Sequence, residues 1–330
     1  MSTNGSSHEE PPTASLDDLM QQVAARPEVQ NKRSIQRAYE EPLGETVSFK
    51  HPFRPNAAEE VDIGDDCAAL PDGHGGYQLF AAEGILPAFV QEHPWFAGYS
   101  AVMVNVSDIC AMGGLPQAVT DMLWVRDPDD GGEVWAGMRA AAEAFDVPIV
   151  GGHTTYQCKD RHLGVSILGH APHLLTSHDA RPGETLLMAV DLDGQYVDEY
   201  PFWNAATDAP AERLRTNQEL MATVAQKRWS RTAKDISMGG VIGTLAMLLH
   251  TSQVGATLQL EAVPKPPAVE WEKWLVTFPS YGFLLVAAPE HEKEIRFLFR
   301  EHGVACAAVG EIQAEEGLRV GHAGQRTRVF

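Results

Sequence analysis

The sequence predicts two consecutive domains that each combine α-helices with β-strands, an α/β or α+β fold. The chain has 330 residues, more than one typical domain needs, and its 44% hydrophobic and 21% charged residues are typical of globular proteins. In each half, short apolar runs with strand character alternate with longer segments of helical spacing. The composition of the chain changes near residue 175. We therefore expect one domain over 61–172 and a second over 173–330.

The N-terminal part of the chain is expected to lie outside both domains. Residues 1–15 are polar and contain no apolar core, which indicates a disordered leader without a signal peptide. Ser15 suits the N-cap of a helix that begins at the next residue, and Pro27 interrupts that helix. A second helix is expected over 29–39. Residues 16–60 are therefore predicted to form a helical segment that ends in a connector rich in proline and glycine.

The first domain is predicted to alternate strands with two long helices. The residues over 95–112 are apolar at helical spacing, and those over 132–145 form an alanine-rich helical pattern. Apolar runs rich in β-branched and aromatic residues indicate strands between these helices. The predicted strands cover 61–63, 77–82, 118–125, 147–150 and 163–169.

The second domain is predicted to begin after a turn at 181–184, where Pro182 and Gly183 stand together. The apolar run that follows indicates a strand. Strands are predicted at 185–190, 256–260, 282–288 and 304–312, and helices at 211–228, 240–249 and 290–301.

The charge of the chain argues against nucleic acid as a partner. There are 45 Asp and Glu residues against 25 Lys and Arg residues, so the formal net charge is −20. Proteins that bind nucleic acid present a basic face, and no block of lysines and arginines occurs here. The excess of acids either maintains solubility or includes a metal site.

Cysteine content and hydropathy indicate a cytoplasmic protein. The four cysteines, Cys67, Cys110, Cys158 and Cys306, include no pair with the spacing of a zinc or thioredoxin motif. Nothing indicates a disulfide framework, which favours a reducing compartment. No apolar run reaches the 18 residues that a transmembrane helix needs, so no membrane association is expected.

Two acidic motifs in the first domain could hold a metal ion. Asp65 and Asp66 follow Gly64 directly, and adjacent carboxylates repel unless a cation or water screens them. Asn105 and Asp108 share one face of the predicted apolar helix, where polar groups need partners. Taken alone, the first pair is more typical of a surface turn, and hydrogen bonds within the core explain the second. The alternative for both is contact with Mg²⁺ or phosphate.

Two glycine-containing motifs could contact phosphate. The sequence GGHT over 151–154 follows a predicted strand, and backbone N–H groups approach phosphate closely where side chains are absent. His153 is a candidate acid or base. Asp235 and Ser237 precede a predicted helix, where they either cap it or stand beside a bound anion. The chain contains no P-loop sequence, so these motifs suggest ATP chemistry of another kind.

Together and in this order, the motifs resemble the aminoimidazole ribonucleotide (AIR) synthase-like superfamily. The similarity covers about 60–312. GDDCAAL over 64–70 resembles the family's first acidic motif, NVSDICAMGGLP over 105–116 resembles its long helical motif, and GGHT and KDISMGG over 234–240 resemble two later ones. The superfamily includes AIR synthase, thiamine-monophosphate kinase and selenophosphate synthetase. The second half looks most similar to an uncharacterised AIR synthase-related branch.

This resemblance implies an N-terminal domain whose sheet forms a barrel in a homodimer, followed by a C-terminal α/β sandwich domain. It also implies ATP and Mg²⁺ between the domains and a small-molecule substrate. Metal ligands would be Asp65, Asp66, Glu83, Asp108 and Asp235. Nucleotide contacts would come from Asn105, Gly151, Gly152, Thr154, Asp235 and Ser237, and catalytic groups would be His153 and Asp108.

The resemblance implies an ATP-using enzyme in which a substrate oxygen attacks the γ-phosphoryl group, as in a cyclo-ligase that releases ADP and phosphate. His153 and Met238 replace acids of thiamine-monophosphate kinase, which argues against the alternative of a small-molecule kinase. A second alternative is a nucleotide-binding regulator without turnover. The motifs do not identify the acceptor substrate.

Overall fold

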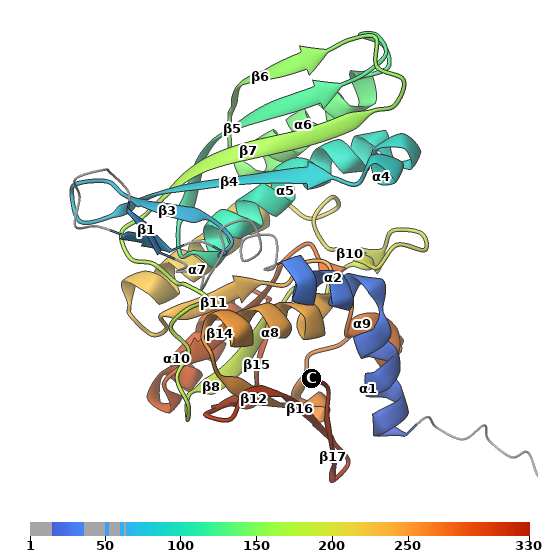
Figure 1. Ribbon diagram of the computed structural model, residues 1–330. Coiled ribbons are helices and arrows are strands. Elements are labelled where there is room, and N and C mark those ends of the chain that lie inside the picture. The colour runs from blue at the N-terminus through green and yellow to red at the C-terminus, as the bar shows by residue number, and fades with distance from the viewer. Residues whose placement is uncertain (1–14, 36–49, 53–59, 63) are drawn as a thin grey trace, which may run out of the picture.

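A computed structural model of the chain describes residues 15–35, 50–52, 60–62 and 64–330 (Figure 1). The predicted leader, apart from Ser15, lies outside these residues, as do most of the connector and the end of the helix predicted over 29–39. Within the described residues, no helix combines the length and apolarity that crossing a bilayer requires.

Two helices open the described chain, as predicted. Helix α1 (Leu16–Ala25) starts at a capping box in which the Asp18 N–H donates to Ser15 Oγ at 3.2 Å and the Ser15 N–H donates back to Asp18 Oδ2 at 3.3 Å. Helix α2 (Pro27–Ile35) begins at the proline itself, because proline is tolerated in the first turn of a helix. Two short antiparallel strands follow, β1 (Lys50–Pro52) and β2 (Glu60–Asp62).

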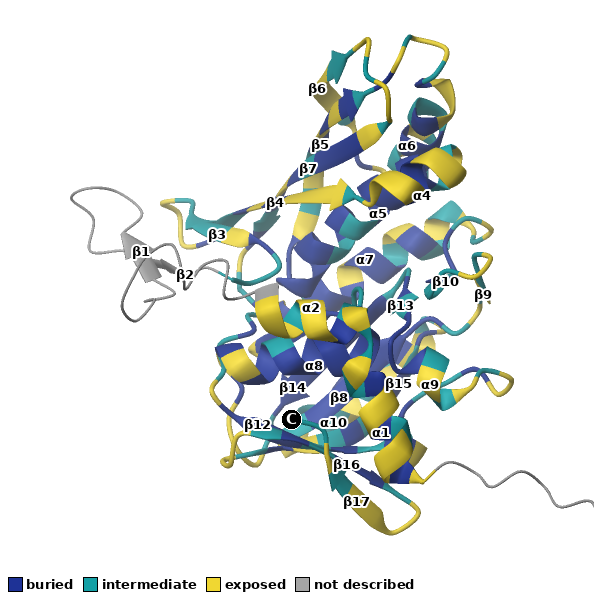
Figure 2. Ribbon diagram, turned by 45° about the vertical axis from the view of Figure 1, so that its right-hand side comes forward, coloured by how far each residue is buried: buried dark blue, intermediate teal, exposed yellow. Residues whose placement is uncertain are grey.

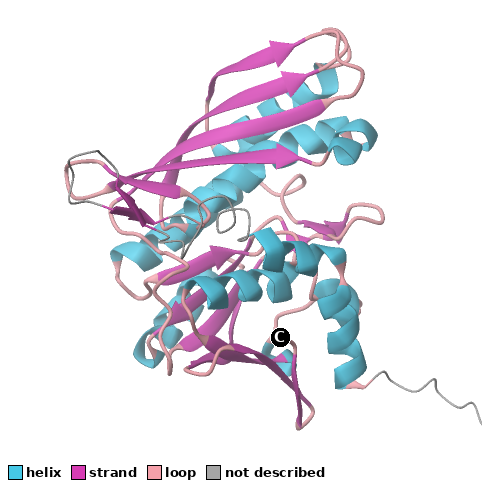
Figure 3. Cartoon of the chain, in the orientation of Figure 1, coloured by secondary structure: helices cyan, strands magenta, loops and turns pink. Residues whose placement is uncertain are grey.

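The first domain is a five-stranded mixed sheet with helices along one face (Figures 1 and 3). Its strand order is β3-β4-β7-β5-β6, and β5 and β6 form its parallel pair. The strands are β3 (Ala68–Pro71), β4 (Tyr77–Ile85), β5 (Leu115–Trp124), β6 (Ile149–Thr155) and β7 (His162–Ala171). The helices are α4 (Pro87–Glu92), α5 (Pro94–Ala111) and α6 (Gly132–Phe145).

Helix α5 is the central element of the first domain. Most of its residues are buried, as its continuous apolar sequence predicted. It packs closely on α6 through two glycines: a Cβ on Gly98 would lie 2.1 Å from the Val134 carbonyl oxygen, and one on Gly137 would lie 1.8 Å from that of Trp95. This close packing fixes the direction of α5, which carries Asn105 and Asp108.

The opposite face of the same sheet is not covered by any described helix of this chain (Figure 3). Large apolar side chains stand exposed on its strands. They are Phe80, Leu115, Met122, Val150 and Leu168. Apolar side chains that gather on one uncovered face of a sheet are typical of an interaction surface.

The second domain is built on a seven-stranded sheet in the order β11-β14-β8-β15-β12-β16-β17. The strands are β8 (Thr185–Val190), β11 (Thr232–Asp235), β12 (Gly255–Gln259), β14 (Gly282–Ala287), β15 (Ala305–Gln313), β16 (Gly317–His322) and β17 (Gln325–Arg328). Helices cover both faces, so the central strands β8 and β14 are buried almost throughout (Figure 2). The helices are α7 (Ala211–Gln226), α8 (Gly240–Thr251), α9 (Trp271–Trp274) and α10 (Glu292–Glu301).

Alternate residues of β8 belong to two hydrophobic cores. Leu187 and Ala189 join a core that continues into the first domain through α5 and α7, whereas Leu186 and Met188 face a core that includes α1 and α8. The first core therefore crosses the domain boundary. A small sheet of β9 (Gln195–Tyr196), β10 (Phe202–Asn204) and β13 (Phe278–Pro279) lies beside this boundary.

Three sequence predictions need correction. Gly151 and Gly152 lie within β6, not in a turn after a strand, because the backbone pairs with β5 through Thr155. The strands β3, β16 and β17 were missed, since β3 is short, β16 has two alternating apolar residues, Leu318 and Val320, and β17 is polar and lies at the sheet edge. The short elements α4, α9, β9, β10 and β13 were missed for lack of a repeating pattern.

Candidate active site

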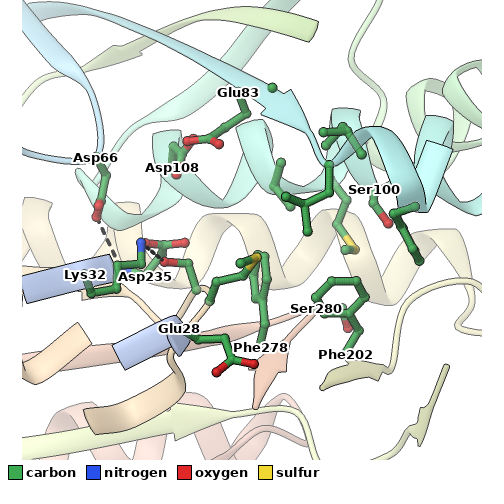
Figure 4. Close-up of a pocket in the computed structure, with 18 of the residues that line it drawn as sticks. Glu28, Lys32, Asp66, Glu83, Ser100, Asp108, Phe202, Asp235, Phe278 and Ser280 are labelled. Atoms are coloured by element: carbon green, nitrogen blue, oxygen red, sulfur yellow. Dashed lines mark hydrogen bonds between the residues drawn. The ribbon is translucent and has the colours of Figure 1, made fainter. Parts of the chain in front are cut away.

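A cavity of about 450 Å³ opens between the two domains. One wall comes from the first domain, through the loop before β3, the end of β4 and helix α5. The opposite wall comes from the second domain, through β10, β11 and β13, and helix α2 adds a third side. Figure 4 shows acidic side chains gathered at one end of this cavity. This volume is in the range of pockets that bind small molecules.

Three carboxylates converge at the acidic end. Asp66, Asp108 and Asp235 each offer an oxygen, and these oxygens all lie within 4.8 Å of one another. Asp66 comes from the loop before β3, Asp108 from the last turn of α5 and Asp235 from the end of β11. The left-handed backbone of Gly64, with φ of 92°, makes the turn that leads into this loop.

Lys234 holds the loop of the two adjacent aspartates. Its Nζ donates a hydrogen bond to Asp66 Oδ1 and lies 3.8 Å from Asp65 Oδ1. Asp65 Oδ2 accepts the Ser177 N–H at 2.6 Å, and Asp66 Oδ2 accepts the Asp235 N–H at 3.2 Å. A buried lysine thus supplies one of the cations that the repelling aspartates need. Asp65 faces these partners and is not a member of the three-carboxylate cluster.

Part of the polar surface on α5 has no partner among the described residues. Asp108 is 6% exposed, and its Oδ2 accepts no hydrogen bond. Asn105 Nδ2 donates to the Ala101 carbonyl at 2.8 Å, while its Oδ1 is buried and unpartnered. Unpartnered buried oxygens are unfavourable without a ligand. The carboxylate oxygens of Asp66, Asp108 and Asp235 at their observed spacing fit Mg²⁺, whereas Asn105 does not line the cavity.

The carboxyl pKa values show that this cluster favours a positive partner. Burial, and then the neighbouring Asp235 and Glu83, raise the pKa of Asp108 well above its usual range. Burial and Asp66 raise the pKa of Asp235 to about 8, although Lys234 and Lys32 act in the opposite direction. Burial opposes the charge of Lys234, but Asp66 and Asp65 outweigh it and raise its pKa. The acids therefore favour binding a proton or a metal cation.

Two further charged residues line the same end. Glu83 lies near the end of β4. Burial of its carboxyl group raises its pKa, while the charge of Lys32 acts to lower it. Lys32 comes from α2 and donates to Ser237 Oγ at 2.8 Å. Sequence reasoning missed Lys32. The spacing of Glu28, Asn31 and Lys32, which places them on one face of the helix, could have indicated this residue. All three side chains line the cavity.

The structure does not bring every predicted site residue together within one chain. Asp65, Asp66, Glu83, Asp108, Asp235 and Ser237 line the cavity. Gly151, Gly152, His153 and Thr154 lie on β6 at the far edge of the first sheet and do not line it. Met238, which stands where the kinase branch has an acid, does line it.

The fold and the cavity define a two-domain α/β protein with a cluster of carboxylates between its domains. The family model described as AIR synthase related protein, N-terminal domain, matches residues 64–171, and the model of the corresponding C-terminal domain matches residues 183–323. The chain therefore belongs to the AIR synthase-related family, which confirms the family predicted from the motifs.

Several curated proteins are similar along most of their length. An uncharacterized protein of Synechocystis is 44% identical over 273 residues, which cover 82% of this chain and 84% of the relative. An uncharacterized protein of Methanocaldococcus jannaschii is 34% identical over 273 residues, with the same two shares. The selenide, water dikinase of Cronobacter sakazakii is 24% identical over 309 residues, 80% of this chain and 87% of that protein.

Solved structures support the same fold. PurL of Thermotoga maritima complexed with ADP matches with a TM-score of 0.69 at 20% identity, over 81% of this chain and 45% of that one. This chain thus spans less than half of that PurL. AaThiL complexed with AMPPCP and TMP matches with a TM-score of 0.60 at 19% identity, over 80% of this chain and 89% of that one. At these identities the likeness establishes the fold.

Proposed function

We propose that this protein is a Mg²⁺-dependent enzyme that uses ATP to phosphorylate an oxygen of a small-molecule substrate. The observation that carries the proposal is the cluster of Asp66, Asp108 and Asp235, whose buried oxygens lie within 4.8 Å of one another and include the unpartnered Asp108 Oδ2. Proteins of similar fold support it, since PurL was solved with ADP and AaThiL with AMPPCP.

Each residue of the acidic end has a part in this proposal. Asp66, Asp108 and Asp235 would hold Mg²⁺, with Glu83 as a further ligand, and the bound ion would neutralise charge on the triphosphate. Lys234 and Asp65 keep the Asp66 loop in place through their mutual contacts. Lys32 presents an ammonium group at the cavity wall, where it can contact a phosphate oxygen.

We propose the cyclo-ligase type of reaction. The substrate oxygen forms a bond to the γ-phosphorus while the bond from that phosphorus to the ADP oxygen breaks. When the oxygen belongs to an amide, the amide nitrogen loses a proton and an iminophosphate results. An internal amine then displaces phosphate and closes a ring, so ADP and phosphate leave. Met238 at the cavity wall, in place of an acid, supports this choice over a kinase.

We also propose that the protein works as a homodimer. The uncovered sheet face with Phe80, Met122 and Leu168 is apolar enough to bind a second copy. The strand β6 of one chain lies apart from its own cavity, so the nucleotide contacts predicted for residues 151–154, and the acid or base role of His153, would require the second copy. The proposal places the protein in the cytoplasm with no membrane or nucleic-acid partner.

Calorimetry on the Asp108→Asn variant tests the assignment of the metal site. We expect Mg²⁺-dependent binding of AMPPCP to be lost, because an amide removes the charge that holds the cation. The Asp130→Asn variant is the control, since Asp130 pairs with Arg161 at 2.8 Å outside the cavity. Unchanged affinity in Asp108→Asn would refute the proposed site.

Phosphorus NMR of the products separates the three reaction types. A cyclo-ligase yields ADP and free phosphate together with a new ring, whereas a small-molecule kinase yields ADP and a stable phosphorylated product. A regulator binds ATP and produces neither across a panel of metabolites. A phosphorylated end product would overturn the cyclo-ligase proposal in favour of the kinase.

A further inference from the structure

The cavity has a second end that lies away from the carboxylates. Four aromatic rings form an edge-to-face series there, which we call the aromatic wall: Phe96, Phe89, Phe202 and Phe278. Their ring centroids lie 5.8 Å apart for Phe89 and Phe96, 5.1 Å for Phe89 and Phe202, and 6.1 Å for Phe202 and Phe278. Figure 4 shows Phe202 near Ser100 and Ser280, away from the carboxylates.

Both domains contribute to the aromatic wall. Phe89 and Phe96 belong to α4 and α5 of the first domain, whereas Phe202 and Phe278 face each other in the parallel pair β10 and β13 of the second. Ile85 and Leu86 extend the apolar lining, and Leu86 is 47% exposed. Apolar surface that stays accessible inside a cavity is a binding surface for an apolar group.

Two of the polar groups at this end already have partners. Asn204 Oδ1 accepts the N–H groups of Ala206 and Thr207 at 3.1 and 3.2 Å. Ser280 Oγ accepts the N–H of Ala205 at 2.9 Å. Ser100, on α5 two turns before Asp108, adds a hydroxyl at this same end of the cavity (Figure 4). Because Asn204 Oδ1 and Ser280 Oγ already accept hydrogen bonds, few acceptors remain at this end for the polar edge of a nucleobase.

The cations lie at the other end. Among the described residues that line the cavity, Lys32 and Lys234 are the lysines and arginines, and they are bound to Ser237 and to the Asp65–Asp66 loop. A phosphate group against the aromatic wall would lose water without gaining a cation from the described lining residues, which is strongly unfavourable.

We infer that the aromatic wall binds the acceptor substrate, and that this acceptor has a flat aromatic or aliphatic body that carries an oxygen function but no phosphate group. Its oxygen function would point along the cavity toward the carboxylates. The inference rests on the proposed function, because it takes the acidic end as the place of the triphosphate. It adds a substrate class, and it makes phosphorylated sugars and ribonucleotides unsuitable as acceptors.

Calorimetry with naphthol and naphthyl phosphate, a pair that differs only in the phosphate, tests the inference. Each probe is titrated into the full chain with Mg²⁺ and AMPPCP present, and again without them. We expect naphthol to bind at least about 10-fold more tightly than naphthyl phosphate under both conditions. Phe202→Ala should weaken the binding of naphthol by about 10-fold, and Phe202→Leu should weaken it by about 3-fold. Neither variant should change the affinity for AMPPCP.

Phe297→Ala is the matched control, because this ring on α10 is 59% exposed and outside the cavity. A melting curve for each variant confirms that it folds. If Phe202→Ala does not fold, Phe202→Leu still tests the inference, because leucine keeps most of the side-chain volume. Equal or tighter binding of naphthyl phosphate would overturn the inference. Competition between naphthol and AMPPCP would also overturn it, because the wall would then hold the adenine. Absence of AMPPCP binding would instead refute the proposed function. The titrations without nucleotide would still test whether the aromatic wall binds naphthol.

Discussion

Lys234 of the second domain donates a hydrogen bond to Asp66 of the first, and both side chains are almost fully buried, at 3% and 5% exposed. The two residues are 168 positions apart in the chain. Their contact fixes the loop that carries Asp66 against the strand that carries Asp235. The geometry of the carboxylate cluster therefore depends on the docking of the two domains.

Lys234→Met is expected to destabilise the protein by about 3–5 kcal/mol, because removing one member of a buried pair leaves an unpaired charge. Urea unfolding measures the free energy. The control is Arg231→Met, whose pair with Glu184 at 3.3 Å is half exposed, and its loss should cost less than about 1 kcal/mol. Equal effects in the two variants would contradict the importance of the interdomain pair.

Lys32→Ala is expected to weaken binding of Mg²⁺ and AMPPCP by about 10-fold, since a cation at the cavity wall contributes to phosphate binding. Lys32→Arg keeps the charge and should restore part of the affinity. Lys293→Ala on α10, outside this cavity, is the control. If Lys32→Ala binds AMPPCP as tightly as the unaltered protein, α2 has only a structural role.

Leu168→Asp is expected to convert a homodimer into monomers, because a carboxylate in an apolar interface loses its water. Light scattering after size-exclusion chromatography measures the mass. The same variant should lose affinity for AMPPCP if residues of β6 reach the cavity of the second copy. Phe297→Asp, on an exposed face of α10, should change neither property. A Leu168→Asp protein that remains dimeric would place the interface elsewhere.

Asp72 makes a pH-dependent contribution to stability near the β3–β4 turn. His170 Nε2 lies 2.9 Å from its carboxylate, and this contact, with the N–H groups of His74 and Gly76, lowers the pKa of Asp72 to about 2. A lowered carboxyl pKa stabilises the folded state above its unfolded value, 3.8, and this stabilisation is lost as the pH falls toward about 2.

Asp72→Asn should therefore lower the melting temperature at neutral pH, and the difference from the unaltered protein should shrink between about pH 4 and about pH 2. Thermal unfolding followed by circular dichroism measures both. Asp146→Asn, at the C-terminal end of α6, is the control for a general effect of removing an acid. A difference that stays constant across this range would contradict the assigned contact.

Local patterns predicted most of the elements. The helix over 132–145 and the strand over 185–190 have the predicted bounds, because each is a continuous run of residues with one clear spacing. The edge strand β17 was missed because it is polar and lacks an alternating apolar signal, whereas β16 was missed because its alternation is limited to Leu318 and Val320. Gly151 and Gly152 resembled a turn but pair along β6, since glycine is compatible with both.

Short motifs and their order were enough to predict the family, the two domains and the acids at 65, 66, 108 and 235. Which of these acids meet depends on the packed fold, since Asp66, Asp108 and Asp235 come from three elements whose carboxylate oxygens the domain docking brings within 4.8 Å of one another. It also revealed Lys32, Lys234 and the aromatic wall, whose members are far apart in the chain. Burial and contact between distant residues are properties of the packed fold, and no local pattern encodes them.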